Sequence, residues 1–157
     1  MSYRQFFSFY LGQNLYGIDI MLVREIINDP QITPVDGARD IVRGLLNLRG
    51  QIVTALDPAT PLGLEETNLL TEDAYCIILK TTEEIIAIGA SGESEIKTSD
   101  DIVGFLVDRV GEVYDVEEHE IEPAPSNLNG AERKLYTGVV KLDNGLMMIL
   151  NVPLILS

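Results

Sequence analysis

The chain has 157 residues, close to the length of one typical domain, and 46% of them are hydrophobic, so we expect one folded unit with a well-buried core. Its formal net charge of -14 repels phosphate backbones and anionic lipid headgroups, which argues against nucleic acid and membrane surfaces as partners. No apolar run approaches the ~18 residues that span a bilayer, and the stretch from Phe6 to Leu11 is too short for a signal peptide. We therefore expect a cytoplasmic protein without membrane insertion.

Ten short runs of residues are typical of β-strands separated by turns. In chain order they cover residues 4–11, 15–18, 45–48, 51–56, 75–80, 84–90, 104–110, 112–116, 137–142 and 146–151. A spacing of roughly 8 to 12 residues between strands is characteristic of β-sandwiches and barrels. Strands do not alternate with long helical patterns, so we predict an all-β protein.

Two segments in the first third allow more than one interpretation. In residues 19–27, the spacing of Ile20, Val23 and Ile27 suits a short helix as well as a twisted strand, so this segment stays open. Residues 36–42 allow one or two helical turns. The next two strands meet at Arg49 and Gly50, where Gly50 can adopt the positive φ that a tight turn demands.

Later strands are expected to pair as hairpins. Residues 75–80 pair with 84–90, and residues 104–110 pair with 112–116 across a bend at Gly111. The strongest hairpin signal is Asp143-Asn144-Gly145, because an Asn-Gly pair accepts the positive φ values of a primed turn. The segments between these hairpins are expected to form loops: residues 57–73, 91–101 and 117–134.

Acidic side chains are concentrated between residues 62 and 130, often as neighbouring pairs such as Glu83-Glu84 and Glu117-Glu118. They suit a solvated surface that discourages edge pairing between sheets; the alternative is an acidic patch recognised by a basic partner. The sequence does not separate these two interpretations. The nearly neutral first third of the chain is where a desolvated contact surface would cost least.

Patterns for catalysis or metal binding are weak. The single histidine, His119, lacks the i, i+4 partner of a helical zinc site, so we interpret it as a surface residue. The single cysteine, Cys76, lies in an apolar strand without a basic neighbour, which indicates a buried structural thiol. There is no serine nucleophile elbow and no phosphate-binding loop. We predict a binding protein without catalytic residues, cofactor or metal; a small acidic hydrolase using paired carboxylates is the competing hypothesis.

An arginine at the predicted strand turn is the most informative local feature. Arg49 lies between Leu48 and Gly50 in an apolar region, where a guanidinium usually has a carboxylate partner or a partner protein. Glu25 is the candidate carboxylate, and the pair is either an ordinary surface ion pair or part of a binding site. The apolar residues around it belong either to the core or to an interface: Ile20, Val23, Ile26 and Ile27.

Six ordered blocks of sequence resemble the bacterial chemotaxis coupling proteins of the CheW family. They are Leu15 to Ile20, Val23 to Ile27, Ile32 to Val35, Gly44 to Val53, Gly104 to Val113 and Gly138 to Leu142. The resemblance covers residues 5 to 156. It implies two intertwined five-stranded SH3-like β-barrels with short helical turns, the first strand packing with the C-terminal half. One CheW-like domain would then span residues 1–157, with one sub-barrel at about 14–80 and the other at about 1–13 plus 81–157.

The resemblance also implies a function without catalysis. Proteins of this family connect the cytoplasmic tip of a methyl-accepting chemoreceptor to the regulatory domain of a CheA-type histidine kinase, in receptor arrays at the inner membrane. By position, Glu25 and Arg49 match the family's charged pair beside the receptor groove, while Phe7, Ile20, Val23 and Ile26 match positions that line it. The kinase would face the sub-barrel of about residues 14–80. A CheW-like scaffold for another receptor and kinase system, such as one governing surface motility, is the alternative.

Overall fold

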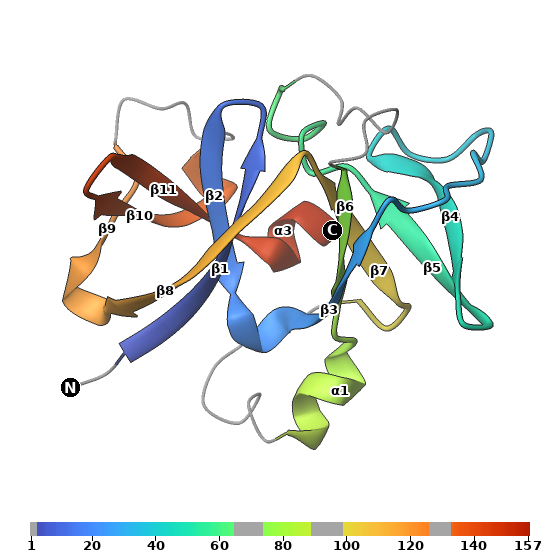
Figure 1. The fold of residues 1–157 in the computed structure, drawn as a ribbon, viewed down its shortest axis with the longest axis horizontal. Coiled ribbons are helices and arrows are strands. Elements are labelled where there is room, and N and C mark those ends of the chain that lie inside the picture. Colours follow the sequence, from blue (N-terminus) through green and yellow to red (C-terminus); the bar gives the residue numbers. More distant parts are fainter. Residues whose placement is uncertain (1–2, 65–73, 89–98, 126–132) are drawn as a thin grey trace.

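The computed structural model describes residues 3–64, 74–88, 99–125 and 133–157. Their chain forms two β-sheets side by side, with a C-terminal helix between them (Figure 1). In chain order the elements are β1 (Tyr3–Leu11), β2 (Asn14–Asp19), the 3-10 helix η1 (Ile20–Leu22), β3 (Val23–Asn28), β4 (Val42–Leu48), β5 (Gln51–Leu56), β6 (Tyr75–Leu79), α1 (Thr82–Ala87), β7 (Val103–Val107), β8 (Arg109–Glu117), the 3-10 helix η3 (Glu118–Glu120), β9 (Ile121–Glu122), β10 (Tyr136–Leu142), β11 (Gly145–Leu150) and α3 (Val152–Leu156). Within these ranges no helix is long and apolar enough to cross a membrane.

The two sheets contain strands from distant parts of the chain. The first has the order β8-β1-β2-β11-β10-β9, and the second has the order β3-β6-β7-β5-β4. The β1–β2 hairpin joins β8 by antiparallel pairing and β11 by parallel pairing. This placement confirms the expected packing of the first strand with the C-terminal half.

Three clusters of buried side chains explain why both faces of several strands are apolar. One lies in the first sheet and includes Phe6 and Met147; another lies in the second sheet and includes Cys76 and Leu106. The third and largest combines residues of both sheets and of α3, and Phe7 belongs to it. Because successive side chains point to opposite faces of a strand, β1 supplies Phe6 to one core and Phe7 to another. Two small cores joined by a shared one match the predicted architecture of two intertwined barrels.

The prediction of a strand at residues 84–90 is wrong, because the chain forms α1 there, at the lower edge of Figure 1. Thr81 Oγ1 accepts the Glu84 N–H at 3.2 Å, and Glu84 Oε1 accepts the Thr81 N–H at 3.0 Å. These reciprocal bonds form a capping box, which satisfies two of the free amides at a helix start. The sequence pattern Thr-x-x-Glu was the available signal. Residues 89 and 90 lie outside the described residues.

The predicted pairing of residues 104–110 with 112–116 is also wrong. The chain does form two strands there, but β7 belongs to the second sheet and β8 to the first. The break falls at Asp108 rather than at Gly111, which lies inside β8. Asp108 donates its backbone N–H to the Tyr10 carbonyl, and its side chain accepts the Gly12 N–H at 2.6 Å. These two bonds anchor the crossing point between the sheets.

The structure decides the two segments that the sequence left open, and it defines the turn at residues 143–145. Residues 19–27 use both alternatives, since η1 is followed directly by β3. Residues 36–41 form two turns but no helix before β4 starts. The hairpin at residues 143–145 is confirmed, although Gly145 alone has a positive φ there, so the two-residue turn Asp143-Asn144 is not of the primed type.

Two strands lie in a different sheet from the one that the expected sub-barrels imply. β2 lies in the first sheet with β1, and β7 lies in the second with β5 and β6. The first sheet contains six strands because the two-residue β9 is added to the expected five. The boundaries of the sub-barrels themselves stay a prediction. Of the predicted loops, residues 65–73, 91–98 and 126–132 lie outside the described residues.

Candidate functional site

An ion pair links the two edges of the second sheet. β3 is one edge strand, and the β4–β5 hairpin forms the other side of the same sheet. The sheet curves enough for Arg49, at the hairpin turn, to donate a hydrogen bond to Glu25 on β3, with Nη2 and Oε1 2.6 Å apart. The predicted partnership of these two residues is therefore confirmed, across 24 positions of sequence.

The pair lies at the surface, and its electrostatics favour the charged forms of both partners. The Glu25 side chain is 29% exposed and that of Arg49 is 69% exposed. The hydrogen bond from Arg49 lowers the pKa of Glu25 below its ordinary value, and the positive charges of Arg49 and Arg24 act in the same direction. Glu25 in turn raises the pKa of Arg49. Near neutral pH the surface therefore carries two fixed, opposite charges in contact.

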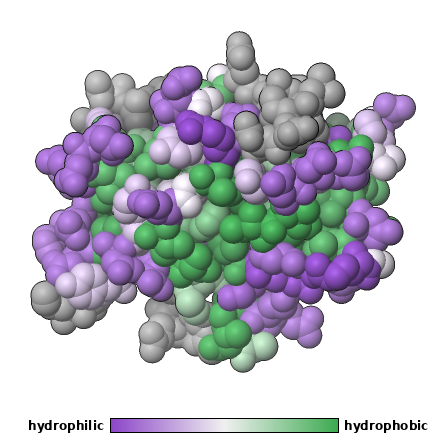
Figure 2. All heavy atoms as spheres, in the orientation of Figure 1, coloured by the Kyte–Doolittle hydropathy of each residue, from purple (hydrophilic) through white to green (hydrophobic). Residues whose placement is uncertain are grey.

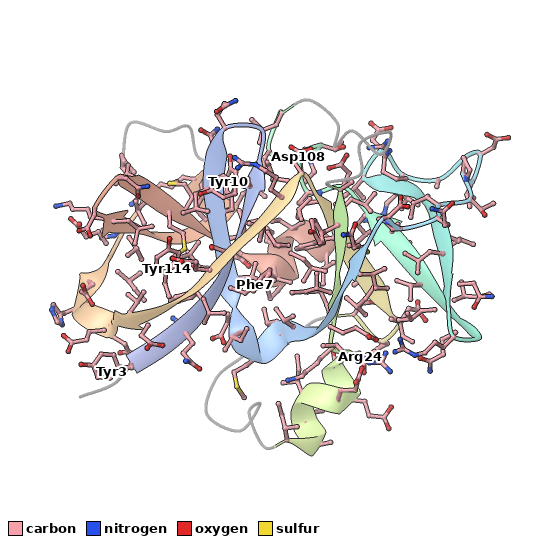
Figure 3. All side chains as sticks on the ribbon, viewed as in Figure 1. Tyr3, Phe7, Tyr10, Arg24, Asp108 and Tyr114 are labelled. Atoms are coloured by element: carbon pink, nitrogen blue, oxygen red, sulfur yellow. The ribbon has the colours of Figure 1, made fainter. Side chains whose placement is uncertain are left out.

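A second arginine connects the same strand to its surroundings. Arg24 lies above α1 in Figure 3, and its Nη2 donates to Gln51 Oε1 at 3.3 Å. Its Nε lies 3.6 Å from Glu84 Oε2. The carboxylate of Glu84 thus caps α1 with one oxygen and contacts Arg24 with the other. β3, β5 and α1 are held together next to Glu25.

The turn that carries Arg49 has an unusual backbone. Arg49 has φ of 50° and Gly50 has φ of 90°, so both residues of the two-residue turn are left-handed. The positive φ of Gly50 was predicted, whereas that of Arg49 was not. The side chain of Asn47 accepts the Gly50 N–H, with Oδ1 and N 2.8 Å apart. Sequence reasoning missed Asn47; its position three residues before the glycine was the signal.

The apolar residues predicted for the groove differ in their exposure. Ile26 follows Glu25 on β3 and is 40% exposed. Ile20 and Val23 are partly buried and pack against the shared core. Phe7 belongs to that core and is 6% exposed, so its side chain lies beneath the surface near the middle of the molecule (Figure 3). In the orientation of Figure 1, apolar side chains gather across the middle of the molecule, with hydrophilic ones on both sides (Figure 2).

The surroundings of Cys76 and His119 suit a structural cysteine and a surface histidine. The described residues include no group of three or more His, Cys, Asp or Glu side chains that could hold a metal ion. Burial raises the pKa of the Cys76 thiol to about 12, as expected for a structural cysteine. His119 is exposed and lies 3.1 Å from Glu117. The lowered pKa of Glu25 has its ion-pair partner Arg49 as the main cause.

A cavity of about 670 Å³ lies at the turn end of the first sheet, but its lining gives no support to the hydrolase hypothesis. Tyrosines, side-chain amides and aliphatic residues surround it, and Arg109 is its charged residue. The Arg109 guanidinium stacks 4.2 Å from the centre of the Tyr10 ring. Among the described residues that line this cavity there is no carboxylate and no histidine, so the paired carboxylates that the hydrolase hypothesis requires are not found there.

Comparison with known proteins assigns the chain to a family. A model of the CheW-like domain matches residues 5–157. The chain belongs to the CheW-like domain family. The Chemotaxis protein CheW of Treponema pallidum (strain Nichols) is 27% identical over 153 residues, which are 98% of this chain and 82% of that relative. The Chemotaxis protein CheW of Thermotoga maritima is 29% identical over 150 residues, covering 96% of this chain and 85% of that relative.

A solved CheW structure confirms the fold. The crystal structure of the scaffolding protein TtCheW from Thermoanaerobacter tengcongensis matches with a TM-score of 0.74 at 25% sequence identity. The match covers 96% of this chain and 90% of that chain. The intertwined barrels expected from six short blocks of sequence are therefore the architecture of the CheW-like family, present here over almost the whole chain.

Proposed function

We propose that the protein is a non-catalytic adaptor that couples the cytoplasmic tip of a methyl-accepting chemoreceptor to the regulatory domain of a CheA-type histidine kinase. Membership of the CheW-like family and the similarity to a CheW scaffold support this proposal. The observation that carries it is the contact between Glu25 and Arg49, 2.6 Å apart. By the resemblance of the sequence, these two residues match the family's charged pair. No cofactor or metal is part of the proposed function.

The receptor side of the proposal uses the face around β3. Glu25 and Arg49 supply a fixed pair of charges at 2.6 Å, and the neighbouring Ile26 supplies exposed apolar area. Ile20 and Val23 contribute the part of their surface that the shared core leaves uncovered. A helical receptor tip with an apolar stripe and a polar flank would satisfy both features, because apolar contacts give affinity and charges fix register.

The kinase side of the proposal uses a second surface of the sub-barrel of about residues 14–80, separate from the receptor surface around Glu25 and Arg49. Two partners that bind the same protein raise each other's affinity when both bind best in the same signalling geometry. Such coupling typically amounts to ~1 to 3 kcal/mol, which is a roughly 5- to 150-fold gain in affinity for the second partner. This role would place the protein on the cytoplasmic side of the inner membrane, recruited to receptor arrays.

Reconstitution tests the proposal directly. The purified chain is mixed with a receptor cytoplasmic fragment, with a CheA-type kinase, and with both, and binding and kinase autophosphorylation are measured. We expect binding to each partner alone, a ternary complex, and higher kinase activity when all three are present. Failure to bind both partners, with the protein folded, would rule out the adaptor function.

A further inference from the structure

Asn47 is an exposed polar residue that lies outside the predicted site but contacts the turn that carries Arg49. It pairs across the hairpin with Ile52, which is 68% exposed, so neither residue contributes to the core. Its side-chain oxygen nevertheless makes a specific bond, 2.8 Å long, to the Gly50 N–H. Asparagine side chains commonly close turns by such local bonds to the backbone.

The conformation of Arg49 requires this kind of support. Leu48 and Gln51 are the last paired residues of the hairpin, so Arg49 and Gly50 alone form the turn. Glycine adopts positive φ freely, but an L-residue with a side chain is disfavoured there because its Cβ approaches the backbone. The Arg49 φ of 50° is one of two positive values at non-glycine positions within the described residues.

The backbone conformation decides where the guanidinium points. The direction of the Cα–Cβ bond follows from φ and ψ, and the left-handed turn brings Arg49 within 2.6 Å of Glu25. A relaxed turn would leave this long side chain, 69% exposed, free to sample other rotamers in water. Two hydrogen bonds therefore hold the turn. Asn47, on β4, accepts the Gly50 N–H, and Glu25, on the opposite edge strand, accepts a hydrogen bond from the Arg49 guanidinium.

We propose that Asn47 is a positioning residue for the receptor site: by binding the Gly50 amide, it holds the β4–β5 turn in the geometry that directs Arg49 at Glu25. The receptor part of this inference rests on the proposed function, whereas the effect on the Glu25–Arg49 contact is a property of the free protein. Asn47 itself need not touch the receptor.

The free protein gives the first test. In Asn47→Ala the Gly50 amide loses its protection from hydrogen exchange, and the pKa of Glu25, followed by NMR, rises toward its ordinary value because Arg49 spends less time in contact. Asn47→Asp retains the accepting oxygen and keeps the Gly50 amide protected. Asn144→Ala is the matched control, since Asn144 is an exposed asparagine in another two-residue turn with an ordinary φ. An unchanged Glu25 pKa in folded Asn47→Ala overturns the inference.

Receptor affinity gives the second test. We expect Asn47→Ala to raise the Kd for a receptor cytoplasmic fragment by ~3- to 10-fold, the effect of one net hydrogen bond. In an Arg49→Ala background the same substitution should change Kd by less than about twofold, because its effect passes through Arg49. Equal effects in both backgrounds overturn the positioning role. A different outcome separates the two proposals. If Asn47→Ala changes the Glu25 pKa and the Gly50 amide protection as expected, but no variant binds the receptor fragment and the wild type does not bind it either, the proposed function is wrong. The role of Asn47 in the turn would still hold.

Discussion

Ile26→Ala tests the apolar part of the proposed receptor site, and its effect can be estimated from exposure. The substitution removes about three CH₂-sized groups, worth ~2.4 kcal/mol when fully buried. Ile26 is 40% exposed in the free protein, so docking that covers it would newly bury about two fifths of this value. The expected loss of binding is ~1 kcal/mol, or a roughly fivefold increase in Kd. The rest, ~1.4 kcal/mol, should appear as a lower free energy of unfolding.

Isothermal titration with a receptor cytoplasmic fragment measures the first effect, and urea unfolding measures the second. Leu146→Ala is a suitable control, because Leu146 is 57% exposed on β11 in the other sheet. The control should leave the receptor Kd unchanged. A folded Ile26→Ala variant with the receptor Kd of the wild type would show that the receptor does not cover this side chain.

Three further predictions concern stability. Gly104→Ala should lower the free energy of unfolding by ~1 to 3 kcal/mol in urea, because a Cβ there would overlap the Cys76 sulfur; an additional Cys76→Ala change should restore part of the loss. Thr81→Ala should cost ~1 kcal/mol by removing the N-cap of α1, and an unchanged urea midpoint would mean that the cap contributes nothing. The stabilising effect of Arg49 on Glu25 should be complete above about pH 4.5, the ordinary pKa, and should disappear as the pH falls through the lowered pKa of the folded protein. The difference in urea midpoint between wild type and Arg49→Ala should therefore vanish in acid; a constant difference would exclude this origin.

The hairpins with strong local signals were predictable from the sequence. Gly50 supplied the turn between β4 and β5, and the Asp143-Asn144-Gly145 run located the turn between β10 and β11. In both cases alternating apolar residues flank a short break, so local patterning and turn chemistry agree. The pairing of Glu25 with Arg49 could also be predicted, because an arginine in an apolar region usually has a carboxylate partner.

The errors have two sources: a long-range change of sheet and a local helix signal that was overlooked. Alternation in residues 104–116 predicted strands correctly but carried no information that the chain changes sheets at Asp108. At residues 84–88, an apolar run was interpreted as a strand although the Thr81 capping box favours a helix. The left-handed φ of Arg49 was not predicted either, because it depends on bonds from Asn47 and from a distant strand.

If the Glu25–Arg49 contact is part of a receptor-binding surface, and not only of the structure of the barrel, reversing one of its charges must weaken receptor binding. The most direct measurement is the Kd of Arg49→Glu for a receptor cytoplasmic fragment, compared with its Kd for the kinase regulatory domain. Reversing the charge places two carboxylates together at the site, so we predict a loss of receptor affinity of roughly tenfold or more with kinase affinity retained. Wild-type receptor affinity in the folded variant would mean that the ion pair takes no part in receptor binding.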